Sequence, residues 1–455
     1  MIILNRRDQF IEDHSKNFEV LLKKLITIRS LSVTGEGIED VVKFLTNLLK
    51  KLLHADIEVI PTKGHPIIIA KLTGTTKRNV LLYGHYDVMA AGDISKWQSD
   101  PFTLSKREGR FYGRGVGDNK GQLLAQILGV YSYLELHQTL PFNVTFFIEG
   151  EEEQGSPDLA AAVKELAQTK LKTVDAAIVV DGSANPDGTN VLRLGNRGVF
   201  AFELISKTGQ HDNHSGSFGN IMTNPVTQLF NFLIRIYDVK TGQVKIPHFY
   251  DGILEPTAGE KEWIAKLPFN KDEIIAQAGI NQLAMDKFTY YHKLMFEPTF
   301  NIFGIKGGYL QKGVKTSIPH EASLKVDCRL VDRQDISVIK ENLLKVYQPE
   351  IASGQLQVSI LGELPPEKTS ATSEQIEWLY QAIKRATGKA YIEPVMPGSV
   401  PNYVWKNFLK VPVFTIPYAN ADERNHDIDE NMTIKNFYNG IRISYEILSG
   451  NSSEI

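Results

Sequence analysis

The sequence contains a single cysteine, which excludes a disulfide framework. Cys328 has no second cysteine with which to form an intramolecular disulfide. It lies in the alternating run 322–330, which predicts a strand, and a buried thiol in such a place fills space more often than it reacts. No neighbouring motif supplies a base for this thiol, which argues against a cysteine nucleophile.

Long apolar runs and an excess of one charge are also missing. No segment approaches 18 apolar residues, and residues 1–10 contain arginines without the apolar core of a secretion signal. We therefore expect a soluble, cytoplasmic protein with no membrane partner. The 50 Lys and Arg residues nearly balance the 53 Asp and Glu residues, and the net charge is −3. This balance gives no reason to expect a nucleic-acid partner, and it favours small-molecule chemistry.

An intact phosphate-binding loop is absent as well. The glycine-dense run 113–121 contains Lys120, but Gly121 follows it where the frame G-x-x-x-x-G-K-[ST] requires Ser or Thr. Nucleotide binding is therefore disfavoured. The glycines are better explained by a tight backbone path that orients Asp118.

The chain is long enough for two domains. Apolar residues at helical spacing alternate with short apolar runs typical of buried strands. Helices are predicted at 10–29, 38–53, 122–136 and 159–167, and strands at 57–61, 67–70, 80–83, 144–148 and 176–180. This alternation predicts an α/β domain with three layers.

The pattern changes near residue 195 and changes back near residue 365. The intervening segment predicts the succession βαββαβ of a small ferredoxin-like α+β insert, with a polar stretch, 240–283, that this plan does not require. Its elements are expected at 200–206, 224–237, 299–305, 323–330, 336–347 and 356–361. A helix at 374–387, a strand at 411–416 and a helix at 434–448 then resume the α/β pattern. We expect a catalytic domain in two parts, 1–195 and 365–455, interrupted by the inserted lid and dimerisation domain 196–364.

Five short clusters along the chain carry imidazoles and carboxylates. A pair of zinc-like ions polarises a carbonyl and activates water, and it needs such ligands with open positions for water and substrate. Three of the clusters directly follow predicted buried strands, where open α/β sheets gather their functional groups. We expect Asp118 to bridge the two ions and Glu152 to remain free as a base. The expected ligands are His85, Asp118, Glu153, Asp181 and His426.

Neighbouring residues refine this site. Asp87 lies two residues from His85, so on an extended chain both side chains point the same way, and Asp87 can accept the ring N–H. Glu152 and Glu153 are adjacent and therefore point differently, so that one can take a proton while the other holds metal. On spacing alone, His214 is better explained as a surface histidine. Spacing alone likewise gives no functional role to Arg329, Thr316 and Ser399.

Taken together, these motifs resemble the M20 family of metallopeptidases over nearly the whole chain. The similarity rests on Gly-His-Tyr-Asp-Val (84–88), Tyr-Gly-Arg-Gly-x-x-Asp-x-Lys-Gly (112–121), Glu-Glu-x-Gly-Ser (152–156) and His426. Within the family the chain looks most like the carnosinase-type dipeptidases, because of the elements 214–216, 315–319 and 398–401. It departs from many relatives at Asn119, where they have a second Asp, and at the extra carboxylate of Glu151.

The resemblance implies a role for each site residue. One metal would take His85, Asp118 and Asp181, and the other Asp118, Glu153 and His426. Arg329 and Ser399, with Gly398 beside them, would anchor the carboxyl end of the substrate, and Thr316 would help to close the site. His214 would steady the oxyanion from the partner protomer of a homodimer formed through the inserted domain. In relatives the bond corresponding to Asp118–Asn119 is cis.

The leading hypothesis is a zinc-type metallopeptidase that cleaves the amide bond of dipeptides or very short peptides. Glu152 would be the base that activates the water between two divalent ions, with zinc preferred and manganese or cobalt as alternatives. An N-acyl-amino-acid deacylase or desuccinylase would use the same chemistry. A metal-stabilised binding protein without turnover is the other alternative, although it would have no use for the free carboxylate of Glu152.

Overall fold

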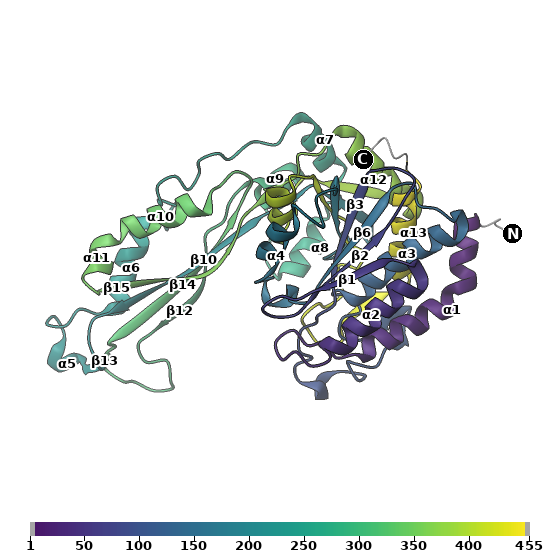
Figure 1. The fold of residues 1–455 in the computed structure, drawn as a ribbon. Helices are drawn as coiled ribbons and strands as arrows, with labels where there is room; N and C mark the ends of the chain where they lie inside the picture. Colours follow the sequence, from purple (N-terminus) through teal and green to yellow (C-terminus); the bar gives the residue numbers. More distant parts are fainter. Residues whose placement is uncertain (1–4, 451–455) are drawn as a thin grey trace.

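One large sheet forms the centre of the fold in the computed structural model, which describes residues 5–450 (Figure 1). Its strands lie in the order β1-β2-β6-β3-β7-β18-β8-β17. β3 pairs in parallel with β6 and β7, whereas β1 and β2 pair antiparallel at one edge. The strands are β1 (Asp56–Ile60), β2 (Ile67–Leu72), β3 (Asn79–His85), β6 (Asn143–Glu149), β7 (Ala176–Val179), β8 (Asn190–Arg193), β17 (Ala390–Glu393) and β18 (Val413–Thr415).

Helices cover both faces of this large sheet, which confirms the expected α/β class. Along β2, Ile68 and Ala70 join one apolar core while Ile67 and Ile69 join the other, because successive side chains point to opposite faces. No helix within residues 5–450 is both long and apolar enough to cross a membrane. One face carries α1 (Arg6–Thr27), α2 (Ile38–Leu53), α3 (Lys120–His137), α12 (Ser373–Thr387) and α13 (Ile434–Leu448), and the other carries α4 (Leu159–Leu166) and η3 (Trp405–Leu409).

The chain returns to the large sheet after a long excursion. β17 and β18 come from the C-terminal part, and β18 lies between β7 and β8. The chain leaves through β9 and re-enters through β16, which pair antiparallel with each other. The remaining short elements near the large sheet are β4 (Ser105–Arg107), β5 (Arg110–Tyr112), β9 (Gly195–Asn196), β16 (Glu367–Lys368), β19 (Asn431–Thr433), η1 (Ile94–Lys96) and η2 (Glu152–Gln154).

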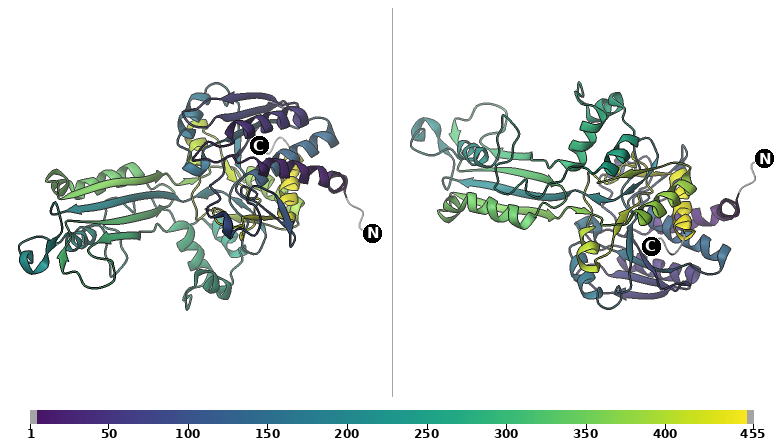
Figure 2. Two further views of the ribbon diagram at one scale, coloured as in Figure 1. Left: turned by 90° about the horizontal axis from the view of Figure 1, so that it is seen from below. Right: turned by 90° about the horizontal axis from the view of Figure 1, so that it is seen from above.

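The excursion forms a second, antiparallel sheet that extends away from the large one (Figure 2). Its order β12-β14-β10-β15 is the strand order of a βαββαβ unit, and its elements fall in the succession that the sequence predicts. We call it, with its helices and tip, the projecting unit. It comprises β10 (Gly198–Lys207), β11 (Asn213–His214), α5 (Ser215–Phe218), α6 (Pro225–Ile236), β12 (Asn301–Gly307), β13 (Ser317–Ile318), β14 (Glu321–Leu330), α10 (Ile336–Val346), α11 (Gln348–Ala352) and β15 (Leu356–Leu364).

Three helices between α6 and β12 lie outside the projecting unit. They are α7 (Ala258–Lys266), α8 (Lys271–Ala278) and α9 (Lys287–Phe296). Ile264 of α7 and Met295 of α9 instead share an apolar core with Val191 and Tyr391 of the large sheet. Part of the segment 196–364 therefore packs on the body of the protein, because these side chains find their apolar cover there.

Candidate active site

The C-terminal ends of three neighbouring parallel strands bring the first group of side chains together. His85 is the last residue of β3. Glu152 and Glu153 lie in η2, just beyond β6, and Asp181 follows β7. Because β6 and β7 flank β3 in the sheet, these side chains converge on one edge, as strand ends do in open α/β sheets.

Asp118 lies between two histidines from distant parts of the chain. One of its carboxylate oxygens is 3.2 Å from Nε2 of His85, and the other is 3.1 Å from Nε2 of His426. His426 is in turn 2.8 Å from Oε2 of Glu153. The Asp118–Asn119 peptide bond is cis, as the resemblance implies. The two oxygens of Asp118 thus face different ligand sets, which is the geometry that a bridging carboxylate needs.

The potential ligand atoms form two groups. Within each group, all of these atoms lie within 4.8 Å of one another. The groups are His85, Glu152 and Asp181, and Asp118, Glu153 and His426. The structure therefore brings together every residue expected to hold metal, and it adds the expected base to the first group. Oε2 of Glu152 lies 3.9 Å from Nε2 of His85.

The site is crowded with negative charge. Burial raises the pKa of Asp181 to about 6, and the charge of Asp118 adds to this effect. Burial, together with the carboxylates of Asp181 and Asp118, raises the pKa of Glu152 well above its ordinary value. Burial by itself would raise the pKa of Asp118, but the hydrogen bonds from His426 and His85 hold this pKa below its usual range.

The donor set fits divalent cations. Within residues 5–450, no lysine or arginine nitrogen lies within 4.0 Å of a carboxylate oxygen of Asp118, Glu152, Glu153 or Asp181. Among the basic side chains of the described residues, only the imidazoles of His85 and His426 come within that distance, and they do so at Asp118, Glu152 and Glu153. Imidazole nitrogens and carboxylate oxygens are the ligands of catalytic zinc sites, and two divalent ions would compensate the four negative charges.

Asp87 contacts Nδ1 of His85, the ring nitrogen that does not face Asp118. It is fully buried, and its Oδ1 lies 3.3 Å from Nδ1 of His85. Its carboxylate also accepts hydrogen bonds from the backbone N–H groups of Glu152 (3.3 Å) and Glu153 (3.1 Å) and from the hydroxyl of Ser32 (2.7 Å). Nδ1 of His85 is also hydrogen-bonded to the backbone carbonyl of Asp87 at 3.1 Å. Asp87 therefore orients the imidazole through two groups, and its carboxylate also holds the turn that carries Glu152.

Sequence reasoning missed Glu430, which organises the loop of Asp118. This buried carboxylate accepts hydrogen bonds from the N–H groups of Gly117 (2.9 Å) and Asp118 (3.0 Å), and it pairs with Arg114 at 2.7 Å. Gly115, at φ +89°, also donates to it. Arg114 was the one available signal, because a buried arginine requires a carboxylate partner. Nothing in the sequence identifies that partner, which lies more than 300 positions away.

Asn119 and Lys120 have structural roles in this loop. The side-chain amide of Asn119 donates to Oδ1 of Asp181 (3.1 Å), a hydrogen bond that the more usual, ionised Asp could not donate. Lys120 is fully buried and donates to the carbonyls of Leu25 and Ile28 at the end of α1. Its ammonium group is thus unavailable to a phosphate, in agreement with the incomplete phosphate-loop frame.

The predicted substrate residues fall into two separate places. Nη1 of Arg329 donates to the hydroxyl of Ser399 at 2.9 Å, next to Gly398. His214 and Thr316 instead lie at the tip of the projecting unit, with α5 and β13 (Figure 1), where Nε2 of His214 is 3.4 Å from the Thr316 hydroxyl. The ten residues of β14 alone span about 33 Å. The chain does not bring its own His214 to its own metal-ligand groups.

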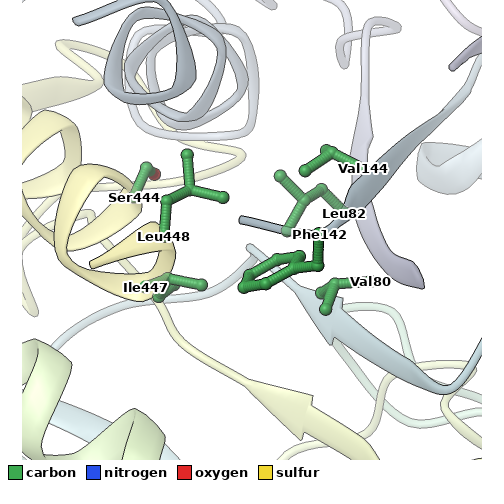
Figure 3. A pocket seen from close by; sticks show the side chains of 7 residues that line it. All are labelled: Val80, Leu82, Phe142, Val144, Ser444, Ile447 and Leu448. Atoms are coloured by element: carbon green, nitrogen blue, oxygen red, sulfur yellow. The ribbon is translucent and has the colours of Figure 1, made fainter. Parts of the chain in front are cut away.

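A small enclosed pocket elsewhere is lined by no histidine, carboxylate or other charged side chain (Figure 3). It lies between β3, β6 and α13, and Val80, Leu82, Val144 and Leu448 are among its apolar walls. The hydroxyl of Ser444 is its only polar side-chain group, and this hydroxyl is hydrogen-bonded to Tyr418 at 2.7 Å. The pocket is a packing gap in the core.

Comparisons with known proteins agree with this geometry. The chain is 28% identical to Beta-Ala-His dipeptidase of Rattus norvegicus, over 97% of this chain and 94% of the relative. It is also 28% identical to the Cys-Gly metallodipeptidase DUG1 of Saccharomyces cerevisiae, over 95% of each chain. Among solved structures, the M20 family metallo-carboxypeptidase Sso-CP2 from Sulfolobus solfataricus has a TM-score of 0.86 at 30% identity, covering 95% of this chain and 99% of the other.

Human carnosine dipeptidase 1 has a similar structure, with a TM-score of 0.77 at 26% identity and 97% of each chain covered. The family model described as Peptidase family M20/M25/M40 matches residues 81–450, a range that includes every residue of the two ligand groups. The chain belongs to peptidase family M20/M25/M40.

Proposed function

We propose that this protein is a two-metal hydrolase that cleaves the amide bond of dipeptides or very short peptides. The observation that carries the proposal is the pair of ligand groups, because Asp118 of the second group also contacts His85 of the first, and Glu152 lies within the first group. The names of its relatives support the substrate class, because Beta-Ala-His dipeptidase and Cys-Gly metallodipeptidase are similar to the chain over nearly its full length.

Two divalent ions, with zinc as the first candidate and manganese or cobalt as alternatives, would be held by the two groups. His85, Asp118 and Asp181 would bind one ion, and Asp118, Glu153 and His426 the other. Such ions polarise the scissile carbonyl and make water a stronger acid. Asp87 keeps Nε2 of His85 directed at the site, because Nδ1 is hydrogen-bonded to the backbone carbonyl of Asp87 and lies 3.3 Å from its carboxylate.

Glu152 would be the general base. Its side chain is 22% exposed, so water reaches it, and burial with neighbouring carboxylates raises its pKa. A raised pKa makes a carboxylate a stronger base, which favours the transfer of a proton to it. Glu152 would take a proton from the attacking water and deliver it to the nitrogen of the leaving amine.

The projecting unit would complete the site in a homodimer and act as its lid. β12 is an edge strand, and its Ile302, Phe303 and Ile305 side chains are exposed, as a surface that pairs with a second copy would be. His214 of one protomer would then stabilise the oxyanion in the site of its partner, with Thr316 beside it. Arg329, Ser399 and Gly398 would bind the carboxyl end of the substrate from within the same chain as the metals.

An N-acyl-amino-acid deacylase would need the same metal site. The two activities are separated by a panel of dipeptides, tripeptides and N-acetyl- and N-succinyl-amino acids, offered to the protein loaded with zinc or manganese. We expect dipeptides with a free amino group to be hydrolysed fastest and chelation to abolish the activity. Dominant cleavage of N-acyl substrates would reject the dipeptidase proposal. Failure to cleave any amide, with two metals bound, would favour a metal-stabilised binding protein.

A further inference from the structure

Two arginines meet where the projecting unit joins the large sheet. Arg197 directly precedes β10, and Arg329 is the penultimate residue of β14. The antiparallel register places Arg329 opposite Val199. Because Arg197 is two residues before Val199, the two arginines are diagonal neighbours on one face. Burial and the charge of Arg329 together lower the pKa of Arg197 to about 10, in keeping with this proximity.

Arg197 differs from the other buried arginines in having no carboxylate partner. Within residues 5–450, four arginines are buried: Arg7, Arg114, Arg193 and Arg197. The first three pair with Glu446, Glu430 and Glu393 at 2.5, 2.7 and 2.7 Å. No Asp or Glu oxygen of the described chain lies within 4.0 Å of a guanidinium nitrogen of Arg197 or Arg329. A buried charge without a partner is costly, so an anion from outside the chain is expected to supply the missing charge.

The protein contacts of Arg197 leave its outer nitrogens for such an anion. Its Nε donates to the carbonyl of Pro397 at 2.8 Å, and its backbone N–H donates to the carbonyls of Met396 and Gly398 at 3.1 Å. These contacts use the inner part of the side chain and the backbone. They also hold the loop that presents Ser399 to Arg329. Arg197, Arg329 and Ser399 therefore surround one place, which we call the anion site.

A short chain of contacts connects the anion site to the metal-ligand edge. Met396 lies next to Pro397, and its sulfur is 3.5 Å from Nη1 of Arg193. Nη2 of Arg193 donates at 2.9 Å to the carbonyl of Ser183, two residues after Asp181. The anion site is thus connected to the proposed catalytic edge through Arg193.

We infer that Arg197 is a second carboxylate-binding residue beside Arg329, and that the pair selects dipeptides with an acidic C-terminal residue. This inference rests on the proposed dipeptidase function. The terminal carboxylate of any dipeptide compensates one guanidinium, which leaves the second without a counter-charge. The side chain of a C-terminal Glu or Asp supplies that charge, and arginine binds carboxylates with two parallel hydrogen bonds.

The test compares Ala-Glu with Ala-Gln, which has nearly the same shape but no side-chain charge. We expect the wild-type kcat/KM to be about 10–100-fold higher for Ala-Glu, the factor that corresponds to one hydrogen-bonded charge. Arg197→Met should reduce this ratio towards one, whereas Arg329→Met should weaken both substrates. Arg235→Met is the matched control, because Arg235 lies on α6 and pairs with Glu350, and it should leave the ratio unchanged.

A wild-type ratio near one overturns the inference, and so does an equal loss on both substrates in Arg197→Met, which would show that Arg197 only holds the loop. Calorimetric titration of both peptides into the chelated wild-type protein gives a readout that does not depend on turnover or on the folding of a variant. Ala-Glu should bind at least about tenfold more tightly there. Equal affinities would refute the anion site, whereas tighter binding of Ala-Glu without cleavage of any dipeptide would reject only the proposed function.

Discussion

Glu152 and Glu153 are adjacent in the chain but face different partners. Glu153 contacts His426 at 2.8 Å, whereas Glu152 lies on the side of His85 and Asp181. We expect Glu152→Gln to lower kcat by a factor of about 10² or more while two metals remain bound, because only the proton acceptor is lost. Glu153→Gln should instead lower the metal content. Kinetics and elemental analysis of both variants check this, and a near-normal rate in Glu152→Gln would rule out its role as base.

Metal binding at neutral pH is expected to release protons. Hydrogen bonds with Asp118 and Glu153 raise the pKa of His426 to about 10, so in the metal-free chain its imidazole is protonated at pH 7. A cation can bind only the neutral ring and must displace that proton. Metal affinity should therefore increase with pH up to about pH 10. Calorimetry of zinc binding to chelated protein, in buffers with different ionisation enthalpies, counts the protons, and a count of zero at pH 7 would contradict this linkage.

At the scale of single residues, the sequence predicted the side chains that the structure gathers into the two ligand groups but few of those that support them. Asp87 was predictable because it lies two residues from His85, so strand geometry alone relates them. Glu430 and Arg197 were not, because each acts on residues brought near by the tertiary fold. Arg197 lies beside Arg329 only through the pairing of β10 with β14.

At the scale of elements, the contact between α3 and α13 depends on a glycine. A Cβ atom at Gly129 of α3 would lie 2.3 Å from Cβ of Ser444 and 2.6 Å from the carbonyl of Ile441, both on α13. Gly129→Ala should therefore destabilise the protein by about 1–3 kcal/mol, although alanine is the better helix former. Gly259→Ala in α7, where a Cβ would meet nothing within 4 Å, should stabilise it by up to about 1 kcal/mol. Urea unfolding of both variants measures the difference, and equal stability would refute the packing argument.

The elements themselves were largely predictable. The buried strands of the large sheet are short apolar runs, and the strands of the projecting unit alternate, because only one of its faces is covered by helices. The strands β8 and β17 and the helices α7 to α9 were not predicted. The apolar side chains of these helices are only weakly periodic, and the fit of α7 and α9 to Val191 and Tyr391 determines where those two helices pack.

At the scale of the whole molecule, the position of His214 predicts shared active sites. His214→Ala should lose activity by about 10²–10³ in kcat while still binding metal, as expected for a lost oxyanion donor. Mixing His214→Ala with Glu152→Gln chains under subunit exchange should restore activity, because each heterodimer regains one intact site. An equal mixture should recover about one quarter of the wild-type activity. No recovery, with heterodimers verified by mass spectrometry, would exclude the exchange of His214.

The separation of His214 from the metal-ligand groups was foreseeable only in part. The sequence places His214 in the inserted segment, far from every ligand cluster, but sequence distance does not give spatial distance. The long strands β10 and β14 separate His214 from the metal-ligand groups by tens of ångströms.

The place of β18 between β7 and β8 has a consequence for the synthesis of the chain. When β8 leaves the ribosome, the middle of the large sheet is missing a strand that begins 220 positions later, at Val413. At ordinary translation rates this gap lasts on the order of 10–40 s. The projecting unit, whose strands end at Leu364, is complete before then. During that interval β7 and β8 expose unpaired edges, so the nascent protein has its greatest need of chaperones while the surface that we propose for dimerisation is already folded.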